Sequence, residues 1–158
     1  MKATLLFSLA LILIISGCKN NVPENADNTF PKPKNEATQV IKDGVFIHIT
    51  QSYDDPHRVL MPLKMATLMA EDKDVIVYLD IHAVEFLVKE AKDIQYADFE
   101  SAHTYIKMLQ EKNVGVYACP ACLKIAGFGP DDLIDGVQTA EKDKFFNFTQ
   151  GRILTLDY

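Results

Sequence analysis

Apolar and polar stretches alternate along residues 43–158, and their spacing changes repeatedly from strand-like to helix-like. Short apolar runs rich in β-branched residues and bounded by turn-forming residues are typical of buried strands. Such runs occupy residues 45–50, 75–80, 114–118 and 152–156. Helical spacing is found between them, at about residues 56–70, 84–91, 101–112, 120–126, 130–134 and 140–148. This alternation predicts an α/β fold with a parallel sheet between helical layers.

The start of the first helix has two possible positions. Asp55 is a good N-cap for a helix that begins at Pro56, but Pro62 would then lie in the helix interior. An interior proline removes a hydrogen bond and kinks a helix. A start near Leu60 avoids this conflict, and the pattern leaves both positions open.

The segment Cys119-Pro120-Ala121-Cys122 directly follows a predicted strand. Pro120 suits the first position of a helix, so Cys119 should lie at the helix N-terminus. The free N–H groups and the dipole there favour a thiolate, which is the reactive form of cysteine. The motif predicts sulfur or redox chemistry at Cys119, with Cys122 as its partner. Half of a zinc site and a pair without chemistry are the alternatives.

Polar residues that follow strands are the next candidates, because sites in parallel sheets form at the carboxyl ends of the strands. Thr50 and Ser52 follow the first strand, His82 follows the second just after Asp80, and His57 begins the first helix. We expect Thr50, Ser52, His57 and His82 to bind a substrate near the cysteines.

The N-terminus predicts export. An 11-residue, largely apolar run from Leu5 to Ile15 follows Lys2, and it is too short to span a bilayer but typical of a signal peptide. Ile15-Ser16-Gly17-Cys18 resembles the bacterial lipobox, which implies cleavage before Cys18 and a lipid on it. The resemblance implies a lipoprotein of the bacterial cell envelope, at the periplasmic face of the outer membrane because Lys19 is not Asp. An ordinary signal peptide with an incidental Cys18 is the alternative.

Composition then divides the remaining chain. Residues 19–42 contain three prolines and few apolar residues, which predicts a disordered tether, and residues 43–158 form one domain. The chain has 16 Lys+Arg and 22 Asp+Glu, so it is acidic with a formal net charge of −6. It shows no basic cluster, which argues against nucleic acid as a partner.

Several segments together resemble the DsrE/DsrF-like family of sulfur-relay proteins. They are residues 44–50, 63–66, 116–123, 132–137 and 145–158, and the cysteine segment with Asp-Leu-Ile-Asp-Gly-Val after it is the most specific. The resemblance implies a three-layer α/β/α fold with a mostly parallel sheet of about five strands, and homo-oligomers such as trimers or hexamers. It also implies a persulfide on a cysteine after the next-to-last strand, a position that Cys119 matches. Those relay proteins are cytoplasmic and this chain is predicted to be exported, and Cys122 adds a second thiol.

The leading hypothesis is a sulfur carrier or sulfur-transfer protein of the envelope, with Cys119 as nucleophile and Cys122 as resolving thiol. Its partners would be a sulfur donor or acceptor protein or a small sulfur compound, without a cofactor or metal. Whether the chain turns over a substrate as an enzyme stays open. A thiol–disulfide oxidoreductase is the second hypothesis, although no proline follows Pro130, which disfavours a thioredoxin fold.

A metal-binding module is the third hypothesis. The two cysteines supply half of a four-ligand zinc site, and histidines from separate loops would have to complete it. His48 lies inside a predicted strand and is interpreted as a core histidine. His103 is expected on a helix surface. Leu123 directly follows Cys122, which excludes attachment of a c-type haem.

Overall fold

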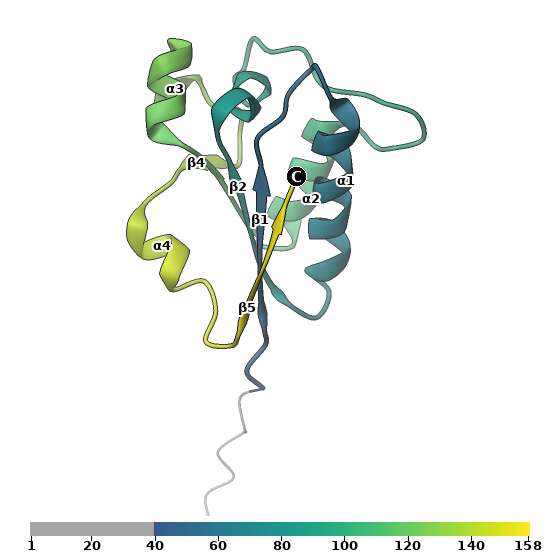
Figure 1. Ribbon diagram of the computed structural model, residues 1–158, viewed down its shortest axis with the longest axis vertical. Coiled ribbons are helices and arrows are strands. Elements are labelled where there is room, and N and C mark those ends of the chain that lie inside the picture. Colours follow the sequence, from purple (N-terminus) through teal and green to yellow (C-terminus); the bar gives the residue numbers. More distant parts are fainter. Residues whose placement is uncertain (1–39) are drawn as a thin grey trace, which may run out of the picture. The chain divides into compact units, whose positions relative to one another are not determined.

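The computed structural model describes residues 40–158, apart from the side chain of Phe146 (Figure 1). The predicted signal peptide, Cys18 and the tether up to residue 39 lie outside the described residues. Lys42, at the predicted end of the tether, accepts a hydrogen bond through its carbonyl from the Thr149 hydroxyl at 2.9 Å. Within residues 40–158, no helix has the length and apolar character that a membrane crossing requires.

Five parallel strands form one sheet in the order β4-β3-β2-β1-β5. The strands are β1 (Gly44–Ile49), β2 (Asp74–Leu79), β3 (Gly115–Ala118), β4 (Val137–Thr139) and β5 (Ile153–Asp157). The helices are α1 (Pro56–Met69), α2 (Ala102–Glu111), α3 (Pro120–Ala126) and α4 (Lys142–Phe146), with 3₁₀ turns η1 (Ile81–Phe86) and η2 (Pro130–Asp132). Figure 1 shows α1 and α2 on one side of the sheet and α3 and α4 on the other. The predicted α/β fold with helices on both sides of a parallel sheet is confirmed.

Helix α1 begins at Pro56, the earlier of the two positions considered. The Asp55 carboxylate accepts a hydrogen bond from the Arg58 N–H at 3.2 Å and so caps the first turn. Pro62 stays inside the helix. Its ring is buried, and this burial helps to offset the hydrogen bond that it cannot donate.

Three predicted helices differ from the structure. The helix predicted at 130–134 is the 3₁₀ turn η2. Of residues 84–91, only 84–86 are helical, as the end of η1, because the backbone after η1 pairs with another segment: Lys89 N–H donates to Asp132 O at 2.9 Å, and Ile134 N–H donates to Leu87 O at 2.8 Å. The predicted helix at 140–148 is the shorter α4, and β4 precedes it. Three residues are too few to show a strand period. With β4 counted, Cys119 follows the third strand of five and not the next to last.

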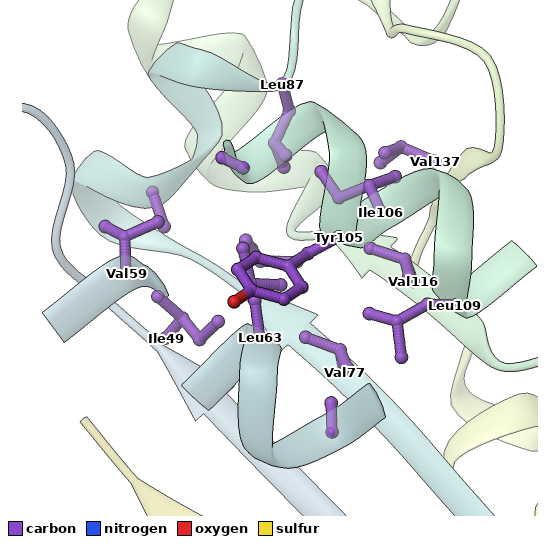
Figure 2. Packing of buried hydrophobic residues seen from close by; sticks show 14 of the residues in the cluster. Ile49, Val59, Leu63, Val77, Leu87, Tyr105, Ile106, Leu109, Val116 and Val137 are labelled. Carbon is purple, nitrogen blue, oxygen red and sulfur yellow. The ribbon is translucent and has the colours of Figure 1, made fainter. Parts of the chain in front are cut away.

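The main core lies between the sheet and the pair α1 and α2. Alternate residues of β1, Val45, Ile47 and Ile49, are at most 3% exposed. Figure 2 shows side chains from both helices meeting those of the central strands in this layer. The contributors that it labels include Ile49, Val59, Leu63, Val77, Tyr105, Ile106, Leu109 and Val116. This packing fixes the strands whose carboxyl ends carry the candidate site.

Candidate thiol site

Cys119 lies where β3 ends and α3 begins. Its N–H donates to Leu79 O of the neighbouring strand at 2.9 Å, which anchors the residue to the sheet. Its Sγ accepts the Cys122 N–H at 3.4 Å, so the side chain is the N-cap of α3 as the sequence predicts. Both cysteines are free thiols of intermediate exposure. The motif therefore presents two reduced sulfur atoms at one edge of the sheet.

The surroundings of Cys119 favour its thiolate. Burial by itself would raise the pKa of this thiol. Hydrogen bonds from the Tyr78 hydroxyl and the Cys122 thiol, and from the N–H groups of Cys122 and Ala121, outweigh that effect and lower the pKa of Cys119. Three different kinds of donor therefore converge on one sulfur atom.

Cys122 has the opposite tendency. Burial raises the pKa of Cys122, and the neighbouring Cys119 and the charge of Asp80 raise it further. The Ile81 N–H donates to Cys122 Sγ at 3.2 Å and opposes this shift. Ile81 has a φ of 50°, which is a strained, left-handed conformation for a β-branched residue. The N–H group that donates to Cys122 Sγ thus belongs to Ile81, a residue whose backbone conformation is energetically unfavourable.

A histidine and two carboxylates lie on the neighbouring strands. His48 Nε2 lies 2.9 Å from Asp80 Oδ1, and His48 Nδ1 lies 2.8 Å from Asp157 Oδ1. Burial alone would lower the pKa of His48, but these hydrogen bonds and the charges of the two carboxylates together raise it. His48 is therefore a partly exposed, ion-paired residue and not the core histidine that the sequence suggested.

Tyr78 connects the histidine to the thiols. Its ring stacks on that of His48, with the centroids 5.7 Å apart at an interplanar angle of 24°. Its hydroxyl and the Cys119 thiol are near enough to shift each other's pKa. Burial raises the pKa of Tyr78 far above its ordinary value, and Cys119 and the charge of Asp80 raise it further. The hydroxyl therefore stays protonated and can donate to a thiolate.

The four predicted substrate-binding residues lie in different surroundings. The Thr50 hydroxyl donates to Tyr158 O at 3.3 Å, and Thr50 lines a cavity of about 500 Å³ with His48, Arg58, Asp157 and Tyr158. His82 is exposed next to Ile81, and its Nδ1 lies 3.1 Å from Glu85 Oε1. Thr50 and His82 thus adjoin residues of the thiol site.

Ser52 and His57 show no such link. Ser52 is buried, and its Oγ has no hydrogen-bond partner among residues 40–158. The His57 ring stacks on Tyr96 with centroids 5.8 Å apart, and it lies 5.5 Å from the Phe99 ring. In the described part of the chain, neither residue hydrogen-bonds to a cysteine. Their binding role remains a prediction.

Sequence reasoning missed His48 as a site residue, and it did not single out Tyr78 or Asp157. The alternation of residues along a strand could have identified His48 and Tyr78. In β1 and β2 they lie between buried residues, so their side chains point to the sheet face opposite to those residues. Asp157 offered no such signal. Its contact with His48 depends on the parallel register of β5 with β1, which pairs residues 109 apart.

The metal-binding alternative finds no ligand set in the residues described. Within residues 40–158, no three or more His, Cys, Asp or Glu side chains are grouped so that they could hold a metal ion. The two sulfur atoms instead accept hydrogen bonds from backbone N–H groups, Cys119 from Cys122 and Cys122 from Ile81. This arrangement suits thiolate chemistry.

The sequence signature of the DsrE/DsrF-like family matches residues 43–152, which is most of the chain. This chain belongs to the DsrE/DsrF-like family. The ychN protein from E. coli is a similar solved structure, 20% identical with a TM-score of 0.58, and the match covers 72% of this chain and 99% of that chain. A protein of unknown function from Methanobacterium thermoautotrophicum, MTH1491, is 20% identical with a TM-score of 0.50 over 72% of this chain and 98% of that chain. At such identity these likenesses show the fold of this DsrE/DsrF-like protein, and no curated protein matches it.

Proposed function

We propose that this DsrE/DsrF-like protein carries sulfur as a persulfide on Cys119 and that Cys122 releases it. Family membership points to a sulfur-relay type of function in general. The observation that supports the specific proposal is the opposite shift of the two thiols, with the pKa lowered at Cys119 and raised at Cys122. Because the thiolate is the nucleophile, Cys119 is the thiol that we expect to react first.

Loading begins when the Cys119 thiolate attacks the outer sulfur of a donor persulfide, R–S–S⁻. An S–S bond to Cys119 forms as the S–S bond of the donor breaks, and the donor leaves as R–S⁻. The Cys122 thiol then gives up its proton, and its thiolate attacks the inner sulfur on Cys119. The persulfide bond breaks, the outer sulfur takes up that proton and leaves as HS⁻, and a Cys119–Cys122 disulfide remains. The donor is a persulfidated protein or a small sulfur compound.

Mass spectrometry after exposure to glutathione persulfide tests these roles. Cys122→Ser should accumulate one extra sulfur atom on Cys119, because the resolving thiol is absent. The wild type should proceed to the Cys119–Cys122 disulfide, and Cys119→Ser should take up no sulfur at either position. If both single variants load sulfur as well as the wild type does, neither cysteine is the acceptor and the proposal is wrong.

A thiol–disulfide oxidoreductase is the second candidate. The arrangement of the two cysteines supports it, because the Cys122 N–H donates to Cys119 Sγ at 3.4 Å and both residues are free thiols. This candidate predicts that the wild type reduces a disulfide substrate while no variant takes up sulfur. The persulfide experiment above therefore separates the two functions.

We also propose that the protein acts at the bacterial cell envelope, held by a lipid on Cys18. The support is the signal-peptide pattern and the sequence Ile15-Ser16-Gly17-Cys18. Cys18→Ala should move the protein out of the membrane fraction when cells are fractionated. Ser16→Thr serves as a control that leaves Cys18 in place. Full retention of Cys18→Ala in the membrane fraction contradicts the lipid anchor.

We propose further that the protein forms homo-oligomers, as trimers or hexamers. An apolar groove of about 400 Å³ on the sheet supports this, because an assembly would remove it from water. It is lined by Phe46, Tyr78, Phe145, Phe148 and Ile153. Light scattering of the purified protein at micromolar concentration measures the mass, and a monomer contradicts the proposal.

A further inference from the structure

Both ring nitrogens of His48 face carboxylate oxygens at hydrogen-bonding distance, 2.9 Å from Asp80 and 2.8 Å from Asp157. An ionised carboxylate only accepts hydrogen bonds, whereas a neutral imidazole has a single N–H to donate. Both contacts are satisfied together only when the ring carries two N–H groups. The geometry therefore corresponds to an imidazolium between two negative charges.

The histidine reaches the thiols through two neighbours. Tyr78 stacks on the His48 ring, and its hydroxyl is near enough to Cys119 for the thiol to raise the pKa of the hydroxyl. Asp80 directly follows Leu79, whose carbonyl accepts the Cys119 N–H at 2.9 Å. The Asp80 charge is close enough to raise the pKa of Cys122 and of Tyr78. A change in the charge of His48 therefore alters the field that Asp80 exerts on Cys122 and Tyr78, the two nearest neighbours of the Cys119 thiol.

We propose that His48 is a positioning residue of the thiol site, whose positive charge offsets Asp80 and Asp157 and thereby keeps Cys119 reactive. With His48 protonated, the three side chains carry a net charge of −1. With His48 neutral, they carry −2, and a negative sulfur nearby becomes less favourable. The inference rests on the proposed function only in taking Cys119 as the reacting thiol.

Other groups also face His48, and their charges must be considered. They are Asp80 and Tyr78 of the β2 segment, Asp157 and Tyr158 of the β5 segment, and Arg58 of α1. Arg58 is exposed and forms an ion pair with Asp55, in which Arg58 Nε lies 3.5 Å from Asp55 Oδ2. This carboxylate partly offsets the positive charge of Arg58. Of the side chains around His48, the imidazole is the one whose ordinary pKa lies in the physiological range. A pH effect between the thiols and this cluster is therefore attributed to His48.

The test is the rate at which iodoacetamide alkylates Cys119 between pH 5 and 9, with the labelled peptide followed by mass spectrometry. His48→Gln keeps a polar side chain but removes the positive charge. At pH values at which His48 is protonated, we expect alkylation of Cys119 to slow by about two- to fivefold, because a unit charge is lost near the sulfur. His103→Gln is the matched control, since His103 lies on α2 and contacts Asp93 and the Phe86 carbonyl. Its alkylation profile should match that of the wild type.

The double variant His48→Gln/Asp80→Asn distinguishes a charge effect from a packing effect. It removes one positive and one negative charge, so the alkylation rate should return toward that of the wild type. If the double variant is as slow as His48→Gln, the proposal is overturned. It is also overturned if the pH profile of His48→Gln superimposes on that of the wild type.

A measurement on His48 itself covers the case in which His48→Gln does not fold. Coupling between two sites is reciprocal, so the Cys119 thiolate must also raise the pKa of His48. NMR titration of the His48 ring should give a lower pKa in Cys119→Ser than in the wild type. Equal pKa values would overturn the proposal. Alkylation and NMR use no sulfur donor, so failure of persulfide loading contradicts the proposed function and leaves this inference intact.

Discussion

The two faces of the sheet are built from the same strands but carry different side chains. On the face under α1 and α2, Ile47 and Ile49 are completely buried. On the other face, Phe46 and His48 alternate with them in the same strand and keep partial exposure. Because successive residues of a strand point to opposite faces, one short sequence supplies both a core and a site. The comparison indicates that stability and thiol chemistry can be changed separately, which the following predictions test.

The largest effect is expected on the buried face. Leu63 of α1 is 0% exposed, so Leu63→Ala should leave a cavity and lower the free energy of unfolding by about 2–5 kcal/mol. Leu68→Ala in the same helix is the control, because Leu68 is 52% exposed and its loss should cost less than about 0.5 kcal/mol. Denaturant unfolding measures both. Equal losses in the two variants would mean that α1 does not supply the core as described.

An intermediate effect is expected for Tyr78 on the other face. Tyr78→Phe removes the hydroxyl that donates to Cys119, so the pKa of Cys119 should rise by roughly one unit, as for a lost hydrogen bond to a charged group. Alkylation at neutral pH should slow about tenfold, with little change in unfolding. Tyr117→Phe is the control, because Tyr117 is the strand neighbour of Tyr78 in β3. A similar slowing in both variants would assign the effect to the aromatic face and not to the hydroxyl.

The smallest effect is a pH dependence of stability. The folded protein raises the pKa of His48, so its ion pairs contribute stability that is complete below the ordinary histidine pKa of about 6.5. This contribution is lost as pH rises through the higher pKa of the folded state. The difference in unfolding free energy between wild type and His48→Gln should therefore shrink from pH 5.5 to pH 9, by less than about 1 kcal/mol. A difference that grows over this range would reverse the sign assigned to His48.

Much of the fold could be predicted from local sequence. The long apolar runs of β1 and β2 were found directly, and the helix predicted at 101–112 is α2, where the Ser101 hydroxyl accepts the Thr104 N–H at 3.3 Å and caps the first turn. The strand β4 could not be found, because three residues carry no period. The helix predicted for the segment after η1 was also wrong, because the backbone of this segment pairs with residues near Leu133, far along the chain.

The candidate site divides in the same way. The cap position of Cys119 depends on adjacent residues only, and the sequence predicted it. The partners that adjust its reactivity come from other strands: Tyr78 from β2 and, through His48, Asp157 from β5. These contacts depend on strand order and register, which one sequence does not supply.

The contact between His48 and Asp157 also has a consequence for biogenesis. The two residues are 109 positions apart, and loop closure over such a distance makes contacts slow to form. A chain that has emerged only as far as α3 already contains both cysteines but lacks β5 and the Asp157 carboxylate. We therefore expect nascent chains to pass through a period in which the cysteines exist without their full electrostatic setting. During that period His48 has Asp80 as its one carboxylate partner, and the second contact forms only when β5 completes the sheet.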